Sequence, residues 1–530
     1  MGSYKIRFLP ADKTILAEEG TTILEAEQNA GLKPDAPCGG RGICGKCNVT
    51  ILQNKDRIVV RACQTRIQHD MVLETSDGLA DKEKILTNGE YRTVPVLPAV
   101  KDADQGYLMA FDIGTTTIAG YLLSGKDGRQ CSVVSMMNPQ FQFGADVIAR
   151  ANYVLEHDGK RMQEVVQEAL NKLIEEACRI SKITPTDIRL VSIAGNTCMH
   201  HLFLGLSPKS LVTAPYVPEV KDGMIMNSSD LNIHIHPDGK IMLLPNIAGF
   251  VGADTSACML AVNFKELVPR TLMIDIGTNG ELVLGNKDRI VTCSTAAGPA
   301  FEGARIACGM RGTKGAVSHV YEKDLKMHME MIDSKLAVGI CGSGLIDIIA
   351  FLIQYGFIDS SGAFLKPEVL KTATAKNEIW RLQKRENMSI FLLQEEDKIK
   401  GLKEIYITQK DIREVQLAKG AIAAGIKMLC KKLEIKIEQI DQVLLAGAFG
   451  NYMNTDSACV IGLIPYELKD KIRGIGNAAG EGAKLAAVNG NLFQEICDLV
   501  KRAEAIELAV EPEFQDLFID ELEFARALET

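Results

Sequence analysis

The sequence has few aromatic residues, no long apolar segment and no excess of positive charge. Aromatic side chains make up 5% of the 530 residues, whereas 46% are hydrophobic and 24% are charged, as is usual for soluble proteins. No apolar run approaches the roughly 18 residues that a membrane-spanning helix needs. The formal net charge of −9 argues against a nucleic acid partner, because phosphate binding usually requires a concentrated basic surface. We therefore expect neither membrane nor nucleic acid among its partners.

The sequence also lacks a secretory signal and a disulfide framework. The segment MGSYKIRFLPADKTIL has no charged start, apolar stretch and small-residue cleavage site, which predicts a cytoplasmic location. Cysteine itself is not scarce, since the chain has 14. Most of these cysteines lie singly in apolar segments such as VTCSTAAG, so we interpret them as small core residues in a reducing compartment.

Four cysteines near the N-terminus have a ligand-like spacing. Three lie in the glycine-rich loop CGGRGICGKC and one, Cys63, in VVRACQT, which we expect to be an apolar strand; the spacing is C-x5-C-x2-C-x15-C. Glycines let a loop wrap around an inorganic core, so the pattern predicts a [2Fe–2S] cluster on Cys38, Cys44, Cys47 and Cys63. The first gap is one residue longer than in the plant-type pattern. Zinc and metal-free thiols are the alternatives, although zinc sites usually pair two short spacings.

Residues 1–78 are predicted to form a small β-rich domain around this loop. Alternating apolar residues in YKIRFL and MVLETS predict strands, and a short helix is expected between them. The segment resembles the ferredoxin fold over residues 3–78, which implies a β-grasp α+β domain. Residues 79–105 are charged and contain two prolines, so we expect a flexible linker there.

After the linker, an apolar strand ending in Asp-Ile-Gly-Thr occurs twice, in YLMAFDIGTTTIAGYLLS and RTLMIDIGTNGELVLGN. One copy could be an ordinary hairpin turn, but two indicate an internal duplication with two phosphate-binding loops. Turn N–H groups and Thr hydroxyls can hold phosphate oxygens while the aspartates orient Mg²⁺ or its water. The candidate residues are Asp112, Gly114, Thr115 and Thr116 in the first loop and Asp275, Gly277, Thr278 and Asn279 in the second.

Further acidic and histidine residues lie in segments that could reach the same cleft. The glycine-rich segment AAGPAFEGARIACG offers Glu302 as a third catalytic candidate beside the two loop aspartates, and GFVGADTSA offers Asp254. His200 and His201 could form a metal or proton-transfer pair. Adjacent helical residues point about 100° apart, however, which favours structural roles for both histidines.

The duplicated region resembles the superfamily of acetate and sugar kinases, heat-shock proteins and actin. Besides the two phosphate loops, it has the connecting segments IAGNTCMHHLFLGL and IGNAAGEGAKLAAVN and the adenosine motif VLLAGAFGNYMN, in the expected order. The resemblance implies ATP between two RNase H-like α/β lobes. It places Gly447 and Gly450 at the nucleotide, where a Cβ atom would block the flat ring. We expect the first lobe at residues 106–206 and the second at 207–530, which makes the chain a ferredoxin-like domain followed by a two-lobed actin-like ATPase.

A ferredoxin domain followed by such an ATPase resembles the reductive activators of corrinoid proteins over nearly the whole chain. The resemblance implies an ATP-dependent corrinoid-protein reductase that passes an electron from its cluster to cob(II)amide, restoring the cob(I)amide needed for methyl transfer. It implies a [2Fe–2S] cluster, ATP and Mg²⁺ as cofactors. It also implies a homodimer, the corrinoid protein of a methyltransferase system as partner, and an upstream low-potential electron donor. Plant-type clusters lie near about −400 mV, so an acceptor roughly 100 mV lower requires about 2.3 kcal/mol, which ATP can supply.

Two other functions fit the same motifs. A small-molecule kinase fused to a ferredoxin domain would need a catalytic base and a phosphoacceptor pocket, for which only Glu302 and Asp254 are candidates. A redox- and nucleotide-responsive sensor would use the state of the cluster to control partner binding. The reductase is preferred because an electron carrier joined to an ATP-binding clamp suggests that the nucleotide drives an unfavourable electron transfer.

Overall fold

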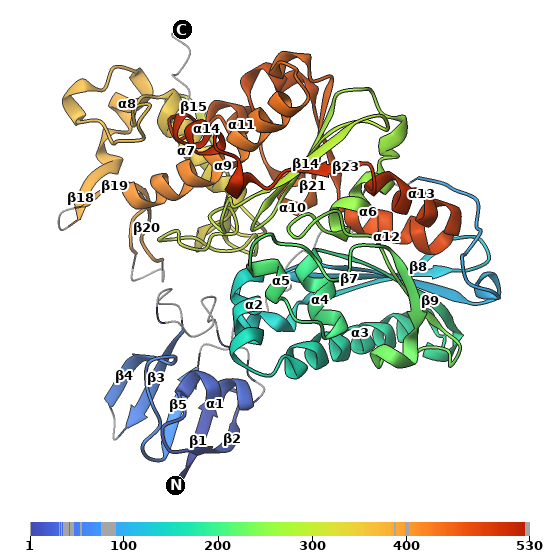
Figure 1. Cartoon of the computed structure of the whole chain (residues 1–530). Helices are drawn as coiled ribbons and strands as arrows, with labels where there is room; N and C mark the ends of the chain where they lie inside the picture. Colours follow the sequence, from blue (N-terminus) through green and yellow to red (C-terminus); the bar gives the residue numbers. More distant parts are fainter. Residues whose placement is uncertain are drawn as a thin grey trace.

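The computed structural model describes most of the chain, namely residues 2–30, 32, 34, 42, 47–53, 56–75, 89, 92–385, 388–397 and 402–524. Figure 1 shows an N-terminal domain, coloured blue, beside a larger part with two lobes. None of the helices in the described residues combines the length and the apolar character that a membrane span requires.

The N-terminal domain is a five-stranded sheet with one helix. The strand order is β2-β1-β5-β3-β4, with β1 and β5 parallel at the centre and the other neighbours antiparallel. The helix α1 begins at a capping box between Thr22 and Glu25 and buries Ile23 against Ile6 and Phe8 of the sheet. The bounds are β1 Ser3–Leu9, β2 Lys13–Glu18, α1 Ile23–Asn29, β3 Asn48–Gln53, β4 Asp56–Arg61 and β5 Met71–Thr75. This is the predicted ferredoxin-like fold.

Each lobe of the larger part contains a six-stranded sheet, and five strands have the same order in both sheets, while the sixth strand, β10 or β23, lies at opposite edges. Their orders are β10-β11-β9-β6-β7-β8 and β22-β21-β12-β13-β14-β23. In each, the strand before a phosphate loop pairs antiparallel with the next strand and parallel with a later one: β6 with β7 and β9, and β12 with β13 and β21. The equivalence confirms the duplication inferred from the repeated motif.

The elements of the first lobe are β6 (Tyr107–Ile113), β7 (Thr117–Ser124), β8 (Gln130–Met137), α2 (Val147–Glu156), α3 (Lys160–Ser181), β9 (Ile188–Gly195), α4 (Thr197–Leu204), α5 (Lys209–Val212), β10 (Met224–Asn227), β11 (Lys240–Leu243) and α6 (Ala253–Ala261). Strand β6 alternates between two cores and is therefore buried on both faces. Leu108 and Ala110 face the core shared with the second lobe, whereas Met109 and Phe111 face α3 and α4.

The second lobe contains β12 (Thr271–Ile276), β13 (Gly280–Gly285), β14 (Ile290–Thr295), β21 (Gln442–Ala446), α10 (Gly447–Tyr452), α11 (Thr455–Val460), β22 (Ile472–Gly476), α12 (Ala478–Val488), α13 (Gly490–Val500), β23 (Ala503–Ala505) and α14 (Phe514–Asp520). Two small sheets and the three α-helices α7, α8 and α9 are inserted between β14 and β21: β15 (Ala316–Lys323), β16 (Lys326–Met331), β17 (Gly339–Ile340), α7 (Gly342–Gln354), α8 (Ala373–Asn377), β18 (Leu382–Arg385), β19 (Met388–Gln394), β20 (Ile405–Thr408) and α9 (Gln409–Lys432). The capping box of Thr408 and Asp411 begins the long helix α9.

The first lobe extends further along the chain than predicted. β10 and β11 lie beyond residue 206, yet β11 pairs parallel with β9 and so belongs to the first sheet. Both strands have only four residues, which is too short for their alternation to stand out in the sequence. We therefore place the end of this lobe after β11 rather than at residue 206.

Three helices, α6, α12 and α13, connect the two lobes through a common core. Their apolar residues pack with Leu108 and Tyr121 of the first sheet and with Met273 and Val283 of the second. In Figure 1 these helices lie between the strands of the two lobes, whereas α3 and α4 cover the outer face of the first sheet. The lobes therefore share buried apolar surface and do not behave as separate domains.

The second half of the predicted linker is packed against the second lobe. Residues 92–100 follow α12 and α13, where the Leu97 N–H donates to the Val488 carbonyl (2.9 Å) and the Gly490 N–H donates to the Leu97 carbonyl (2.8 Å). Three valines of this segment are partly buried in the common core: Val94, Val96 and Val100. The flexibility expected for residues 79–105 is therefore wrong for the part from residue 92 onward.

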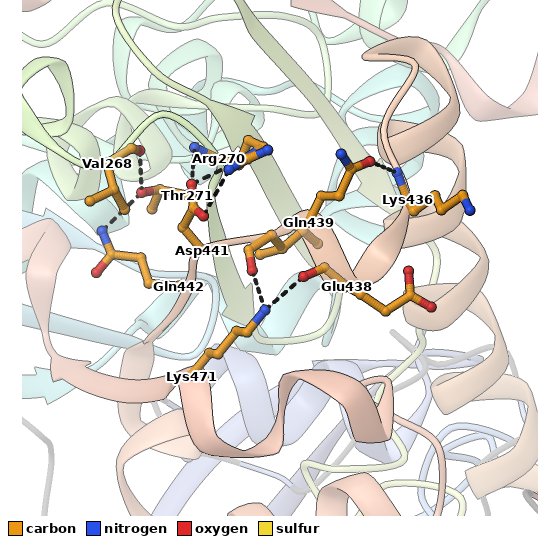
Figure 2. A network of polar contacts seen from close by, with 10 residues as sticks. Val268, Arg270, Thr271, Lys436, Glu438, Gln439, Asp441, Gln442 and Lys471 are labelled. Atoms are coloured by element: carbon orange, nitrogen blue, oxygen red, sulfur yellow. Dashed lines mark hydrogen bonds and ion pairs between the residues drawn. The ribbon is translucent and has the colours of Figure 1, made fainter.

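A polar network at the amino-terminal ends of β12 and β21 fixes the register of these strands (Figure 2). Arg270 donates from Nε and Nη2 to the two carboxylate oxygens of Asp441, each at 3.1 Å. Such a two-point contact is geometrically specific. In the resulting register Asp275 lies beside Ala446, the residue before Gly447. The network therefore determines which residues meet at the opposite end of the strands, where the phosphate loop lies.

The contact between α6 and α12 leaves no room for a side chain at Gly482. A Cβ atom there would lie 1.9 Å from the carbonyl oxygen of Ala257, so a backbone must move. We expect Gly482→Ala to lower the apparent free energy of unfolding by about 2–3 kcal/mol in chemical denaturation. Gly312→Ala is the matched control, because its Cβ would meet nothing nearer than 3.8 Å. Equal denaturation midpoints for the two variants would contradict the close helix crossing.

Candidate active site

The two phosphate loops lie at the carboxyl ends of β6 and β12 and bring Asp112 and Asp275 together. Burial raises the pKa of Asp112 to about 7, and the charge of Asp254 adds to this effect. The pKa of Asp275 is likewise raised to about 7 by burial, then by Asp254 and Asp112. Asp254, in the first turn of α6, has a pKa raised to about 6 by its own burial. The three acids come from both lobes and from the helix between them.

A fourth acid, Glu281 of β13, belongs to the same group and was missed in the sequence. Burial, Asp254 and Asp275 raise its pKa well above the ordinary value. It directly follows Gly280 of the second loop motif, but nothing in its local pattern distinguishes it from a strand residue that faces solvent. The antiparallel pairing of β12 with β13 places Glu281 opposite Asp275, and Asp254 of α6 acts on both carboxylates.

The four carboxylates of this cleft have the donor chemistry for Mg²⁺, provided that phosphate supplies further ligands. Mg²⁺ is typically bound by one or two carboxylates together with phosphate oxygens and water. Within the described part of the chain, no three acidic, histidine or cysteine side chains are close enough to hold a metal ion by themselves. The site therefore fits a Mg²⁺ ion that arrives with a nucleotide.

Asn477, the N-cap of α12, makes a direct contact with the loop aspartate of the other lobe. Its Nδ2 donates to Asp112 Oδ2 at 3.0 Å and to the Tyr121 hydroxyl at 3.3 Å, while its Oδ1 accepts from the Gly480 N–H. The bond favours ionised Asp112 and partly offsets burial. Asn477 lies in the predicted second connecting segment, so the motif was recognised while the role of this side chain was not.

The turns of both loops are held by short-range contacts. A Cβ atom on Gly114 would lie 2.8 Å from the Thr117 carbonyl, so only glycine fits this turn. The Thr115 hydroxyl accepts from Asn196 Nδ2 at 3.0 Å. In the second loop the Gly277 N–H donates to the Asn279 carbonyl at 2.9 Å. Both loops therefore have the tight backbone turn that was predicted.

Glu302 lies next to the second loop, as the sequence suggested. Its Oε1 accepts from the Thr278 hydroxyl at 2.7 Å. Burial raises the pKa of Glu302, whereas Thr278 and the guanidinium groups of Arg311 and Arg150 oppose that rise. Arg150 comes from α2 of the first lobe and Arg311 from the second, and neither was identified from the sequence. Glu302 is therefore a carboxylate between two cations where the lobes meet.

The two glycines of the predicted adenosine motif are constrained by protein atoms. Gly447 has φ +80°, and a Cβ atom on it would lie 2.7 Å from Asp275 Oδ1. A Cβ atom on Gly450 would lie 2.9 Å from Cβ of Leu445, so this glycine lets α10 approach β21. The reason given for Gly450 from the sequence, access for a flat ring, differs from the contact that the structure shows. Nucleotide contact at both positions stays a prediction.

The cysteine site is described at two of its four positions, because Cys38 and Cys44 lie outside the described residues. Cys47 Sγ and Cys63 Sγ are 3.2 Å apart, which is too long for a disulfide bond of about 2.05 Å. Cys47 is 4% exposed. Two thiols thus converge at one point with little exposure, as ligands of a shared cluster must.

Cys63 lies in a turn and not in a strand. β4 ends at Arg61, and the Gln64 N–H donates back to the Arg61 carbonyl at 3.0 Å. Arg61 Nη1 also donates to the carbonyl of Gly42, a residue of the glycine-rich loop with φ +74°. This contact places Gly42 beside the turn that carries Cys63. The strand assignment for Cys63 was wrong because the apolar pattern continues one residue past the end of β4, through buried Ala62.

Comparisons with known proteins agree with this architecture. Three family models match: the 2Fe-2S iron-sulfur cluster binding domain at residues 7–68, the RACo middle region at 107–267, and the C-terminal domain of RACo, the ASKHA domain, at 269–529. The corrinoid activation enzyme RamQ of Eubacterium limosum is 32% identical, over 97% of this chain and 98% of its own length. The chain belongs to this family of corrinoid activation enzymes.

One further relative and one solved structure are also similar to this chain over most of its length. The [Co(II) methylated amine-specific corrinoid protein] reductase of Methanosarcina barkeri is 24% identical over 79% of this chain and 77% of its own. A solved structure of a reductive activator for corrinoid, iron-sulfur protein covers 98% of both chains at 29% identity, with a TM-score of 0.69. The middle-region model of the family ends at residue 267, beyond β11, which agrees with the longer first lobe.

The two adjacent histidines of this family member have structural contacts. His201 Nδ1 bonds to the Thr197 carbonyl at 2.8 Å, and its Nε2 accepts from the Glu219 N–H at 3.0 Å. Burial lowers the pKa of His200 to about 3, so this imidazole is neutral. His200 is fully buried. The contacts support the structural interpretation of both residues.

Replacing Asp275, one of the four carboxylates of the cleft, should stabilise the nucleotide-free protein while weakening Mg²⁺-nucleotide binding. The folded pKa of Asp275, about 7, lies above its ordinary value of 3.8, so the cost of ionising it grows as pH rises from about 4 to about 7 and stays complete above that range. Asp275→Asn should therefore raise the melting temperature by about 2–4 °C near pH 8 and by less near pH 5.

The exposed residue Asp238 provides the control for this measurement, and Asp238→Asn should leave the melting temperature unchanged at both pH values. A lower melting temperature for Asp275→Asn near pH 8, or the same rise at both pH values, would show that the carboxylates do not repel one another.

Proposed function

We propose that this chain is an ATP-dependent reductive activator that returns the cobalt of a corrinoid protein to its methyl-accepting state. When bound, the [2Fe–2S] cluster supplies one electron, which reduces cob(II)amide to cob(I)amide. The observation that carries the proposal is the presence, in one chain, of a converging cysteine site and a two-lobed carboxylate cleft, in a protein related over its full length to a corrinoid activation enzyme.

The residues of the two loops have distinct roles in nucleotide binding. Backbone N–H groups of Gly114, Thr115 and Thr116 in the first loop and of Thr278 and Asn279 in the second bind phosphate oxygens, together with the hydroxyls of the two first-loop threonines. Asp112 and Asp275 hold Mg²⁺ or its water, and Glu302, oriented by Thr278, acts as an acid or base toward the terminal phosphate. Because these groups come from both lobes, a bound nucleotide draws the lobes together.

The coupling to electron transfer uses the linker. Residues 92–100 lie on α12, whose N-cap Asn477 bonds to Asp112. A shift of α12 on nucleotide binding therefore reaches the segment that leads to the cluster domain. We place Cys38 and Cys44 with Cys47 and Cys63 as the four thiolates that hold the cluster.

The remaining assignments follow from the reaction. The partner is the corrinoid protein of a methyltransferase system, and each turnover requires an upstream donor of low potential to return an electron to the cluster. A homodimer and a cytoplasmic location complete the proposal, and no sequence feature favours a membrane or nucleic acid as partner. The nucleotide is ATP with Mg²⁺.

Removing one cluster ligand should separate electron transfer from nucleotide binding. Under anaerobic conditions, the reduced protein with ATP and a cob(II)amide corrinoid protein should give the Co(I) absorbance spectrum. Cys47→Ser should abolish this signal and leave the Kd for ATP within about two-fold of the parent, because the two sites lie in different domains. Cys131→Ser, at a partly exposed cysteine of β8, is the matched control.

Three results would contradict the proposal: Co(I) formation by Cys47→Ser at the parent rate, Co(I) formation by the parent without any effect of ATP, or no Co(I) formation with any methyltransferase corrinoid protein. Formation of ADP that depends on a small molecule and not on the corrinoid protein would indicate the fused kinase instead.

A further inference from the structure

Arg150 of α2 is a fully buried cation that no carboxylate pairs with. The residue is 0% exposed, and burial lowers its pKa only to about 10, so the guanidinium stays charged at neutral pH. Among the described residues, none of the acids has an oxygen within 4.0 Å of it. Asp146, one turn earlier, acts on it only through space while its Oδ1 caps α2 at the Ala149 N–H. Unpaired buried charges are rare because their desolvation costs several kcal/mol, so this one requires an explanation.

The guanidinium of Arg150 contacts the first phosphate loop through a backbone carbonyl. Its Nη2 donates to the Thr115 carbonyl at 2.6 Å and its Nε to the Gly144 carbonyl at 2.9 Å, while Nη1 lies 3.4 Å from Met199 Sδ. Arginine has five N–H groups, so two have no partner in the described part of the chain. All three observed partners are neutral.

Asn138 holds the carbonyls on either side of Thr115 in the same way. Its Nδ2 donates to the Gly114 carbonyl at 2.8 Å, and its backbone N–H donates to the Thr116 carbonyl at 2.8 Å. Asn138 is 0% exposed. Three successive carbonyls of the loop, Gly114 to Thr116, are therefore fixed by two buried residues on one side.

The orientation of these carbonyls determines where the loop N–H groups point. In a trans peptide the carbonyl of one residue and the N–H of the next point to opposite sides of the chain. Fixing the carbonyls of Gly114 and Thr115 on the rear side therefore turns the N–H groups of Thr115 and Thr116 to the other side. Neither of these two N–H groups donates to any residue that the structure describes. They are left available for an external acceptor.

We propose that Arg150 is a positioning residue of the phosphate site, one that aims the Thr115 and Thr116 N–H groups at the nucleotide and adds an unpaired positive charge behind them. The inference rests on the proposed function in one respect, because it takes the ligand of the loop to be the phosphates of ATP. The charged groups that face Arg150 are Asp146 of its own lobe and Glu302 and Arg311 of the other. The cation thus lies where the lobes close on the phosphates.

The test compares nucleotides with and without phosphate on full-length variants. Arg150→Met removes the charge and all three contacts but keeps an unbranched apolar side chain in the buried position. Arg150→Lys keeps the charge and loses the fork that reaches both the Thr115 and the Gly144 carbonyls. Arg161→Met is the matched control, since Arg161 is an exposed arginine of α3 paired with Glu164 and Glu168. Calorimetry gives the Kd of each variant for Mg²⁺-ATP and for adenosine.

We expect Arg150→Met to weaken Mg²⁺-ATP binding by about 10- to 100-fold and Arg150→Lys by about 3- to 10-fold, as for loss of charge-assisted hydrogen bonds. Adenosine binding should stay within about two-fold for both, because its ring and ribose do not reach the loop. The control should match the parent for both ligands. The selective loss for the phosphate-bearing ligand is the signature that a merely structural role would not give.

The inference is overturned if folded Arg150→Met binds Mg²⁺-ATP as the parent does, or if ATP and adenosine weaken equally. If Arg150→Met gives no cooperative melting transition, Arg150→Lys decides instead, by comparing its loss of affinity for Mg²⁺-ATP with its loss of affinity for adenosine. Failure of both variants to fold would mark Arg150 as a structural residue and would also overturn it. A parent that binds no Mg²⁺-ATP would instead contradict the proposed function itself.

Discussion

The cost of ionising four carboxylates in one cleft, which comes first from burial and then from their mutual repulsion, is the constraint on which the arrangement of this protein depends. Asp112 comes from the first lobe, Asp275 and Glu281 from the second, and Asp254 from the helix between them. Burial raises the pKa of each one, and neighbouring carboxylates raise it further for Asp112, Asp275 and Glu281. Ionising them together without a cation is unfavourable, which is why the proposed function assigns Mg²⁺ and phosphate to this cleft.

The duplicated fold explains how this constraint can reach the cluster domain. The equivalent helices α6 and α12 follow equivalent strands and cross at Gly482 inside the common core. α12 has 11 residues and is therefore roughly 16 Å long. Its first end bonds to Asp112 through Asn477, and its last residue, Val488, bonds to the linker at Leu97. One rigid helix thus joins the nucleotide cleft to the stem of the electron-carrying domain.

The tight turns of both loops were predicted correctly, whereas the strands β10 and β11 and the packed linker, which depend on contacts between distant segments, were not. The strand-Asp-Gly-Thr-strand repeat predicts both loops because the turn chemistry is contained in six residues. The extra strands β10 and β11 belong to the first sheet only through the pairing of β11 with β9, and the role of Glu281 depends on its burial in the cleft opposite Asp275. The packed linker was missed because its valines find their partners almost 400 positions later in the chain, and its prolines and charges are equally typical of a free segment.

Arg150 illustrates the same limit, since an arginine in an amphipathic helix is usually solvated and only the fold shows it buried behind the loop.

The central claim is that the carboxylates are partly protonated near neutral pH and ionise when Mg²⁺-nucleotide arrives. Calorimetry of Mg²⁺-saturated ADP binding, in two buffers of different ionisation enthalpy, measures this directly. The account predicts net proton release near about pH 6.5 that disappears near about pH 8.5. Binding without proton release near about pH 6.5 would contradict it.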